Sequence, residues 1–137
     1  MNRSLSLLAA GLATALTLAG TSGAAKLAAV PRLPPGWSHA EINVVVKHVP
    51  HTLIYDHGRV VAVTPTSITL REPDGSVQVI GVSAASQVTI DGQPGSVAQI
   101  RRLEMATTLR VDGGDATRVT VRVPAALAAA LARRGGN

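Results

Sequence analysis

The chain has 137 residues, which predicts one domain of ordinary size and leaves no room for a second domain with its own core. It contains no cysteine, and this excludes disulfides, thiolate metal sites, a cysteine nucleophile and lipid attachment through an N-terminal cysteine. A formal net charge of +5 favours encounter with anionic surfaces, but it describes a solvated surface and does not define a site.

The N-terminal segment is typical of a secretory signal peptide. A short basic start, Met1-Asn2-Arg3, precedes an apolar Leu/Ala-rich run from Leu5 to Leu18, and small residues follow that run. The apolar run is shorter than the roughly 20 residues that a spanning helix needs. We therefore expect a signal peptide over residues 1–25, cleaved after Ala24 or Ala25, with no membrane span afterwards. The expected location is secreted or extracytoplasmic, in the cell envelope.

Residues 26–38 are predicted to be an extended linker, because prolines interrupt them and neither a helical nor a strand period is present. Trp37, near its end, is expected to cover one end of the core, since large rings supply much of the buried surface in a small domain. The β domain is predicted over residues 39–123.

The β domain begins with two predicted strands. The first alternates over Glu41–His48 and is expected to end at Pro50, because proline cannot donate to a strand ladder. The second begins at Leu53 and continues to Val63. Gly58 inside this second run predicts a bulge or a sharp bend.

The clearest local signal is a hairpin from Ser67 to Ile80. Two alternating runs flank a Pro-Asp-Gly turn, which is typical of a hairpin with one buried face. A four-residue loop would pair Leu70 with Val77 and Ile68 with Val79, so these four side chains are predicted to share the core face.

Two shorter elements are predicted next. Gln87-Val88-Thr89-Ile90 is expected to form a short strand. Ser96 is a typical cap residue, and the apolar spacing after it predicts one or two helical turns.

The last strands alternate with period two on either side of a glycine turn, and the turn loop is expected to have three or five residues. Placing Leu109 opposite Val119 turns Ala106 and Thr108 to solvent and makes Arg110 and Arg118 neighbours on the solvent face. Residues 124–137 follow as a predicted short helix and tail, because alanine and leucine favour helix and glycines follow them.

These elements predict an all-β fold, a small antiparallel OB-like barrel or a sandwich with a short C-terminal helix. The motifs run in the order Gly58-Arg59-Val60-Val61-Ala62-Val63, Ser67-Ile68-Thr69-Leu70, Gly75-Ser76-Val77-Gln78-Val79, Gln87-Val88-Thr89-Ile90-Asp91-Gly92 and Ala116-Thr117-Arg118-Val119. This order resembles a bacterial envelope family of unknown function over roughly Gly58 to Val123. The resemblance implies an exported OB-like barrel. Its valine, threonine and glycine motifs supply no catalytic residues.

All four histidines fall between His39 and His57, with Glu41 and Asp56 nearby. Imidazoles bind zinc, copper and nickel, and an exported protein without thiolates would have to use them. The spacing fits no known metal motif, so surface histidines near strand ends are the alternative. The residues proposed as metal ligands are His48, His51 and His57.

A basic face is predicted from Arg110, Arg118 and Arg122, joined by Arg71 and Lys47. Such a face suits an anionic envelope polymer. Nucleic acid is not expected as the partner, because OB-like barrels that bind it also need stacking rings, and the chain has only Trp37 and Tyr55.

The sequence favours a non-catalytic exported module over an enzyme. Its serines fit turn and cap positions, none lies in a Gly-x-Ser-x-Gly elbow, and no phosphate-cradling loop is present. Aspartates in glycine turns are too few and too widely spaced for a calcium loop. The expected role is binding or structural interaction in the cell envelope, with no cofactor, and the metal-binding and polymer-binding hypotheses remain as alternatives.

Overall fold

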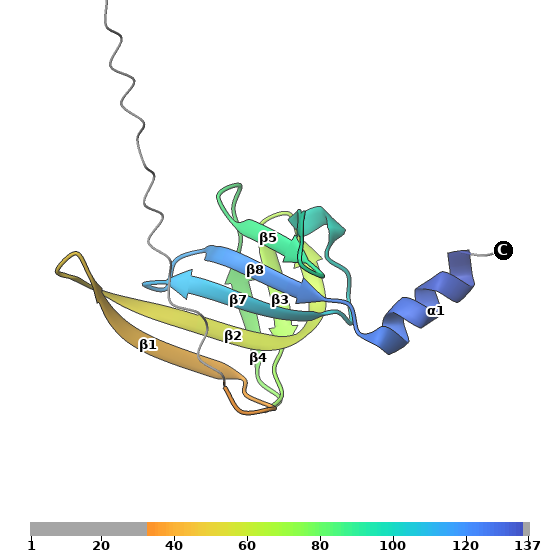
Figure 1. The fold of residues 1–137 in the computed structure, drawn as a ribbon, viewed down its shortest axis with the longest axis horizontal. Helices are drawn as coiled ribbons and strands as arrows, with labels where there is room; N and C mark the ends of the chain where they lie inside the picture. The colour runs from red at the N-terminus through yellow and green to blue at the C-terminus, as the bar shows by residue number, and fades with distance from the viewer. Residues whose placement is uncertain (1–32, 136–137) are drawn as a thin grey trace, which may run out of the picture. The chain divides into compact units, whose positions relative to one another are not determined.

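The computed structural model describes residues 33–135, so the predicted signal peptide, most of the linker and the last two residues lie outside the described part (Figure 1). The described residues are mostly strand and end in one short helix. The elements are β1 (His39–Val46), β2 (Val49–Thr64), β3 (Ser67–Arg71), β4 (Val77–Gly81), β5 (Gln87–Ile90), β6 (Gln93–Gly95), the 3₁₀ turn η1 (Val97–Gln99), β7 (Met105–Val111), β8 (Ala116–Arg122) and α1 (Ala125–Gly135). The predicted all-β class with a short C-terminal helix is confirmed.

The eight strands belong to one sheet in the order β4-β3-β2-β7-β8-β5-β6, and β1 pairs with the first half of β2. All neighbours are antiparallel except β5 and β8, which run parallel. The sheet is mixed and is not closed into a barrel, so the sandwich-like alternative describes it better. Among the described residues, no helix combines the length and the apolar character needed to cross a membrane.

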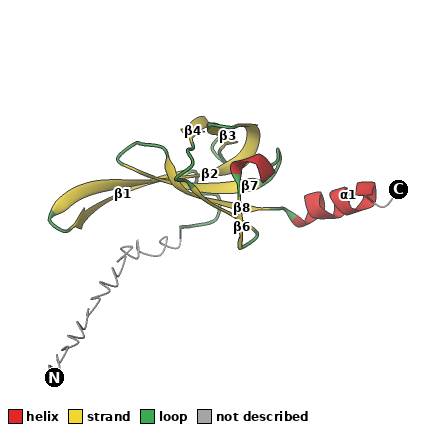
Figure 2. Cartoon of the chain, turned by 90° about the horizontal axis from the view of Figure 1, so that it is seen from above, coloured by secondary structure: helices red, strands yellow, loops and turns green. Residues whose placement is uncertain are grey.

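The core lies where the β3–β4 hairpin folds back over the long strands. Figure 2 shows β3 and β4 together on one side of β2, β7 and β8. A bulge between Val60 and Ala62 in the β2–β3 pairing allows this fold, since the extra residue bends the strand. The fully enclosed apolar side chains come from both layers: Val60, Ile68, Leu70, Ile80, Val119 and Val121. We call the sheet face that carries them the inner face.

The predicted register of the hairpin from Ser67 to Ile80 is wrong by one residue. Leu70 pairs with Gln78 and Ile68 pairs with Ile80, because the loop has five residues and not four. Val77 and Val79 therefore point outward from the edge strand β4, with 51% and 68% of their surface exposed. The pattern of alternating valines fits either register, and Ile80, the largest side chain in this strand, takes the core position.

The predicted facing of the last strand pair is also wrong. Thr108, not Leu109, lies opposite Val119. Ala106 and Thr108 face the core and are almost completely buried, whereas Leu109 is buried on the opposite, outer face. An irregularity between Leu109 and Arg110 then changes the pairing at the end of the ladder.

The first hairpin differs from its prediction at one point. Pro50 does not end a strand but lies in β2 opposite Val45, at a stretch where β1 is the only pairing partner in the described chain. The turn consists of Lys47 and His48, which both have positive φ, at 49° and 65°. This backbone matches the two-residue turn that follows the natural twist of hairpin strands.

Outside these strands, the predicted helical turn is found as η1, and the predicted C-terminal helix is found as α1, none of whose residues is buried. The short strand β6 was not predicted, because its Pro-Gly pair is typical of a turn.

Candidate functional site

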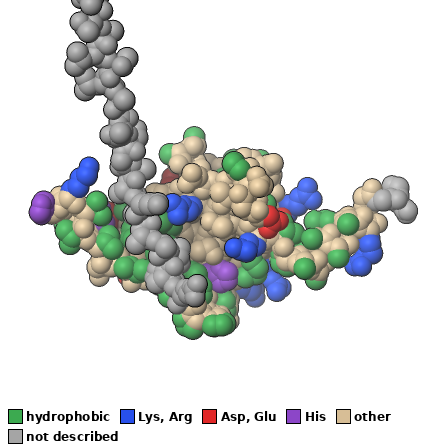
Figure 3. All heavy atoms as spheres, viewed as in Figure 1, with side chains coloured by type: hydrophobic (Ala, Val, Ile, Leu, Met, Phe, Trp, Pro, Cys, Tyr) green, Lys and Arg blue, Asp and Glu red, His purple; other side chains and the backbone are tan. Residues whose placement is uncertain are grey.

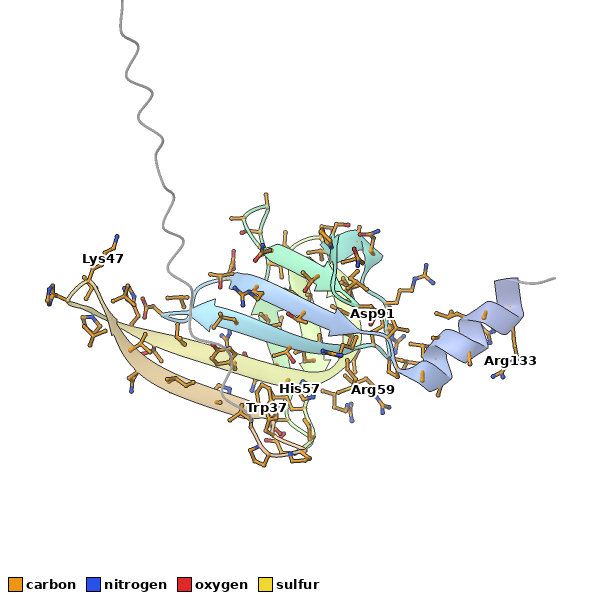
Figure 4. The ribbon with its side chains drawn as sticks, in the orientation of Figure 1. Trp37, Lys47, His57, Arg59, Asp91 and Arg133 are labelled. Carbon is orange, nitrogen blue, oxygen red and sulfur yellow. The ribbon has the colours of Figure 1, made fainter. Side chains whose placement is uncertain are left out.

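The structure does not bring together the three histidines predicted as metal ligands. His48 lies in the β1–β2 turn, His51 bonds through Nδ1 to Asp112 Oδ2 at 2.7 Å, and His57 lies six residues further along β2. Within residues 33–135 they do not form a common group of ligands. His57 stacks on Trp37 with 5.0 Å between ring centroids (Figure 4). Burial alone lowers the pKa of His57.

The three arginines of the predicted basic face do not share one face either. Arg110 is directed to the inner face, where its guanidinium donates to Asp56 Oδ2 from Nη2 at 2.9 Å and from Nε at 3.2 Å. Arg118 and Arg122 are exposed on the outer face of β8. The predicted pairing of Arg110 with Arg118 is therefore wrong, because it depended on the wrong strand register.

The register instead assembles a different arginine row, which the sequence prediction missed in part. Arg71 on β3 pairs with Arg59 on β2, Arg59 pairs with Met105 on β7, and Met105 pairs with Arg122 on β8. Because neighbouring strands lie about 4.8 Å apart, this outer arginine row crosses four strands over about 14 Å. In the sequence, the proline turn between β2 and β3 indicates that residues near 59 and 71 lie opposite each other. The exact partners depend on the bulge in β2, which the sequence does not locate.

The outer arginine row is exposed and carries uncompensated charge. Ion pairs within residues 33–135 use only His39, His51 and Arg110 as their basic partners. A hollow of about 280 Å³ lies at one end of the row, lined by Arg59, Arg71, Glu72, Pro73 and Met105. On the visible part of the same face, Lys and Arg side chains predominate over acidic ones (Figure 3). The row is therefore a cationic feature of this face.

A second polar group is found on the inner face, where apolar side chains would be expected. Asp56 has no exposed surface, and besides Arg110 it bonds to His39, with 2.7 Å between Oδ1 and Nδ1. The other nitrogen of His39 lies 3.3 Å from Glu41 Oε1. A buried carboxylate is stable only when charged or polar partners surround it, and Asp56 has such partners on both oxygens.

Glu72 adds a second buried carboxylate beside Asp56. It follows β3 directly and is 4% exposed. Its Oε2 accepts a hydrogen bond from Ser76 Oγ at 2.7 Å, but its Oε1 is buried and has no hydrogen-bond partner. Thr108, which pairs with Asp56 across β2 and β7, also keeps a buried hydroxyl without a partner.

The His39 contact predicts a pH-dependent stability. The hydrogen bond to Asp56, aided by Glu41, raises the pKa of His39 above its ordinary 6.5 despite some desolvation. A group whose pKa is higher in the folded than in the unfolded state stabilises the fold when it is protonated. This stabilisation is complete at a pH below the unfolded-state pKa, and it is lost as the pH rises through the folded-state pKa. We expect wild type to exceed His39→Gln in free energy of unfolding near about pH 5.5, and this difference to shrink by about pH 9.

Denaturant titration of both proteins in chelator-treated buffer measures the difference. His57, whose pKa shifts the opposite way, is present in both proteins and cancels. A difference that stays constant or grows with pH would contradict the assignment.

A hollow of about 730 Å³ lies between the β2–β3 turn, the loop at Ser83–Ser86 and η1. No charged side chain lines it, so it offers apolar contact and hydroxyl groups but no acid, base or metal ligand. The charged side chains of the described residues that could bind a ligand are therefore those of the outer arginine row and of the group around Asp56.

Comparisons of the chain with protein families, with curated proteins and with solved structures found no match.

Proposed function

We propose that this protein is a non-catalytic binding module exported to the cell envelope, and that it binds an anionic polysaccharide. The observation that carries the proposal is the outer arginine row, formed by Arg59, Arg71 and Arg122 across four strands. The signal-like N-terminus and the resemblance to an envelope family support export. The exposed, uncompensated charge supports an anionic partner.

The arrangement of the cations favours a polymer over a small anion. A single exposed guanidinium binds an anion weakly in water. Arg59 and Arg71 are neighbours, but Arg122 lies at the other end of a row about 14 Å long, so the three cannot all converge on one small anion. A chain with repeated phosphate, sulfate or carboxylate groups can contact them one after another. Arg118 lies four residues before Arg122 and on the same face of β8 by strand alternation, so it extends the same surface.

The aromatic content argues against nucleic acid as the ligand. Single-stranded binding surfaces combine a cationic groove with aromatic rings on which bases stack. Tyr55 is only 2% exposed, and Trp37 is already stacked on His57. This face therefore offers charge without a free series of stacking rings.

The test measures affinity for dextran sulfate, with unmodified dextran as the neutral polymer and single-stranded oligothymidine as the nucleic acid. We expect binding to dextran sulfate that weakens with salt, and no binding to dextran. The triple variant Arg59→Gln/Arg71→Gln/Arg122→Gln should bind dextran sulfate more than about tenfold more weakly than wild type. The slope of log affinity against log salt concentration should fall in magnitude by about 2.

The matched control removes the same charge elsewhere. Arg101→Gln/Arg102→Gln/Arg133→Gln changes three exposed arginines that are not part of the row, and it should weaken binding by less than about threefold. Equal losses in both triple variants, salt-independent binding, or tighter binding to oligothymidine would each overturn the proposal. Export is checked by sequencing the N-terminus of protein from the envelope fraction, which should begin at Ala25 or Lys26.

A further inference from the structure

We propose that His39, Asp56 and Glu72 form a binding site for one divalent ion of a first-row transition metal. The three residues come from the start of β1, the middle of β2 and the loop after β3. One ligand atom from each lies within 4.8 Å of the other two. A metal ion whose ligands lie about 2.1 Å away holds them about 3–4 Å apart. His39 Nδ1 and Asp56 Oδ1, now 2.7 Å apart, would have to separate slightly, and Glu72 would have to move a little closer to them.

The buried, unpartnered oxygen of Glu72 is the independent sign of a ligand. A buried polar atom without a hydrogen bond loses its hydration without replacement, and native structures rarely leave such atoms. Glu72 is 4% exposed and its Oε1 has no partner in the described protein. A metal ion beside Asp56 and His39 would satisfy this oxygen.

Each of the three side chains is held from behind by a second residue. Glu41 faces His39 Nε2, Arg110 donates to Asp56 Oδ2, and Ser76 donates to Glu72 Oε2. The atoms left free of these contacts are Nδ1, Oδ1 and Oε1, one from each side chain. Outer contacts that fix the orientation of each ligand are the usual construction of protein metal sites, including the histidine–carboxylate pair.

The charges of the group match a divalent ion. The carboxylates of Glu41, Asp56 and Glu72 and the guanidinium of Arg110 sum to two negative charges when the imidazole of His39 is neutral, as a ligand must be. An ion bound here would take the place of the hydrogen bond between His39 Nδ1 and Asp56 Oδ1.

The donor set selects the class of metal. One imidazole nitrogen with two carboxylate oxygens suits zinc or manganese, whereas calcium and magnesium prefer oxygen alone. His39 is 39% exposed at its side chain, so water can complete the coordination and ions can enter. The site is separate from the histidines His48, His51 and His57 that the sequence suggested.

The experiment is equilibrium dialysis of the purified mature protein, stripped with a chelator, against ZnCl₂, MnCl₂ or CaCl₂. We expect one equivalent of zinc or manganese per chain and no calcium uptake under the same conditions. His39→Gln and Glu72→Gln should abolish stoichiometric uptake, and Ser76→Ala should weaken it by about 10–100-fold. Asp56 is left unchanged, because its loss would also free Arg110.

His51→Gln is the matched control. His51 also bonds to an aspartate at 2.7 Å, but it is not part of the ligand group, so this variant should bind metal like wild type. Bound metal should also raise the melting temperature of wild type and His51→Gln but not of His39→Gln, an exposed change that leaves the core intact. No uptake by wild type, unchanged uptake by His39→Gln, or loss of uptake in His51→Gln would overturn the proposal.

Discussion

Replacing Gly58 by alanine is expected to lower the free energy of unfolding by about 2–3 kcal/mol, although the change adds only one methyl group. A Cβ at this position would lie 2.5 Å from the carbonyl oxygen of Arg71 and 3.1 Å from Glu72 Cα. Both neighbours are backbone atoms of the segment that leaves β3, so they cannot turn aside as a flexible side chain would. The segment must move away from β2 or β2 must distort.

The matched control is Gly114→Ala, in the turn between β7 and β8. A Cβ there meets only the carbonyl oxygen of Val111 at 3.5 Å, an ordinary contact. We expect this variant to remain within about 0.5 kcal/mol of wild type in urea denaturation. If Gly58→Ala unfolds at the same urea concentration as Gly114→Ala, the backbone at Arg71 and Glu72 does not lie close enough to Gly58 to exclude a methyl group.

Gly58 also illustrates what the sequence could predict and what it could not. A glycine within a strand pattern predicts an irregularity, and the bulge is indeed found close by, between Val60 and Ala62. The sequence could not show that the glycine itself makes room for the backbone at Arg71. That contact depends on how the β3–β4 hairpin folds over β2, which is a tertiary feature.

Strand positions were predictable from alternation, but strand registers were not. Val77 and Val79 have the same propensity for a strand whether they face the core or the solvent. Their facing was decided by a loop one residue longer than expected. A one-residue shift between β7 and β8 also separates Arg110 from Arg118. The registers of β2 with β3 and β7 place Arg59 in the outer arginine row.

The polar group around Asp56 escaped prediction for a different reason. Sequence patterns assign charged residues to the solvent face, because charged side chains are seldom fully buried without a partner. Asp56 and Glu72 are buried because they have partners. His39 and Arg110 reach Asp56 from other strands, and Ser76 reaches Glu72 from within the same loop. The closeness of Asp56 to the histidines was visible in the sequence, but its burial was not.

In metal-free protein, Asp56→Asn is expected to destabilise the fold by about 3 kcal/mol. The substitution keeps the shape of the side chain and removes its charge. Arg110, only 20% exposed at its side chain, is then left without its carboxylate. Breaking one side of a buried ion pair costs more than the pair contributes, since the remaining charge stays desolvated. Urea denaturation at neutral pH measures the loss.

Asp112→Asn is the matched control, because Asp112 also accepts from a histidine at 2.7 Å but lies on the surface. The hydrogen bond from His51, with a further one from Thr52, holds the pKa of Asp112 below its usual range. Solvent screens such an exposed pair strongly, so its removal should cost only a small fraction of the Asp56 effect. Equal losses of unfolding free energy in the two variants would show that the burial of Asp56 does not increase the cost of removing its charge.

A double variant separates the unpaired charge from other effects of the substitution. Asp56→Asn/Arg110→Met removes both partners and keeps a long apolar side chain, so no charge is left desolvated. We expect it to regain about half of the stability lost in Asp56→Asn, because apolar replacement of a buried ion pair is often close to neutral. If the double variant is less stable than Asp56→Asn, Arg110 stabilises the fold through contacts other than Asp56, and the unpaired guanidinium does not explain the loss.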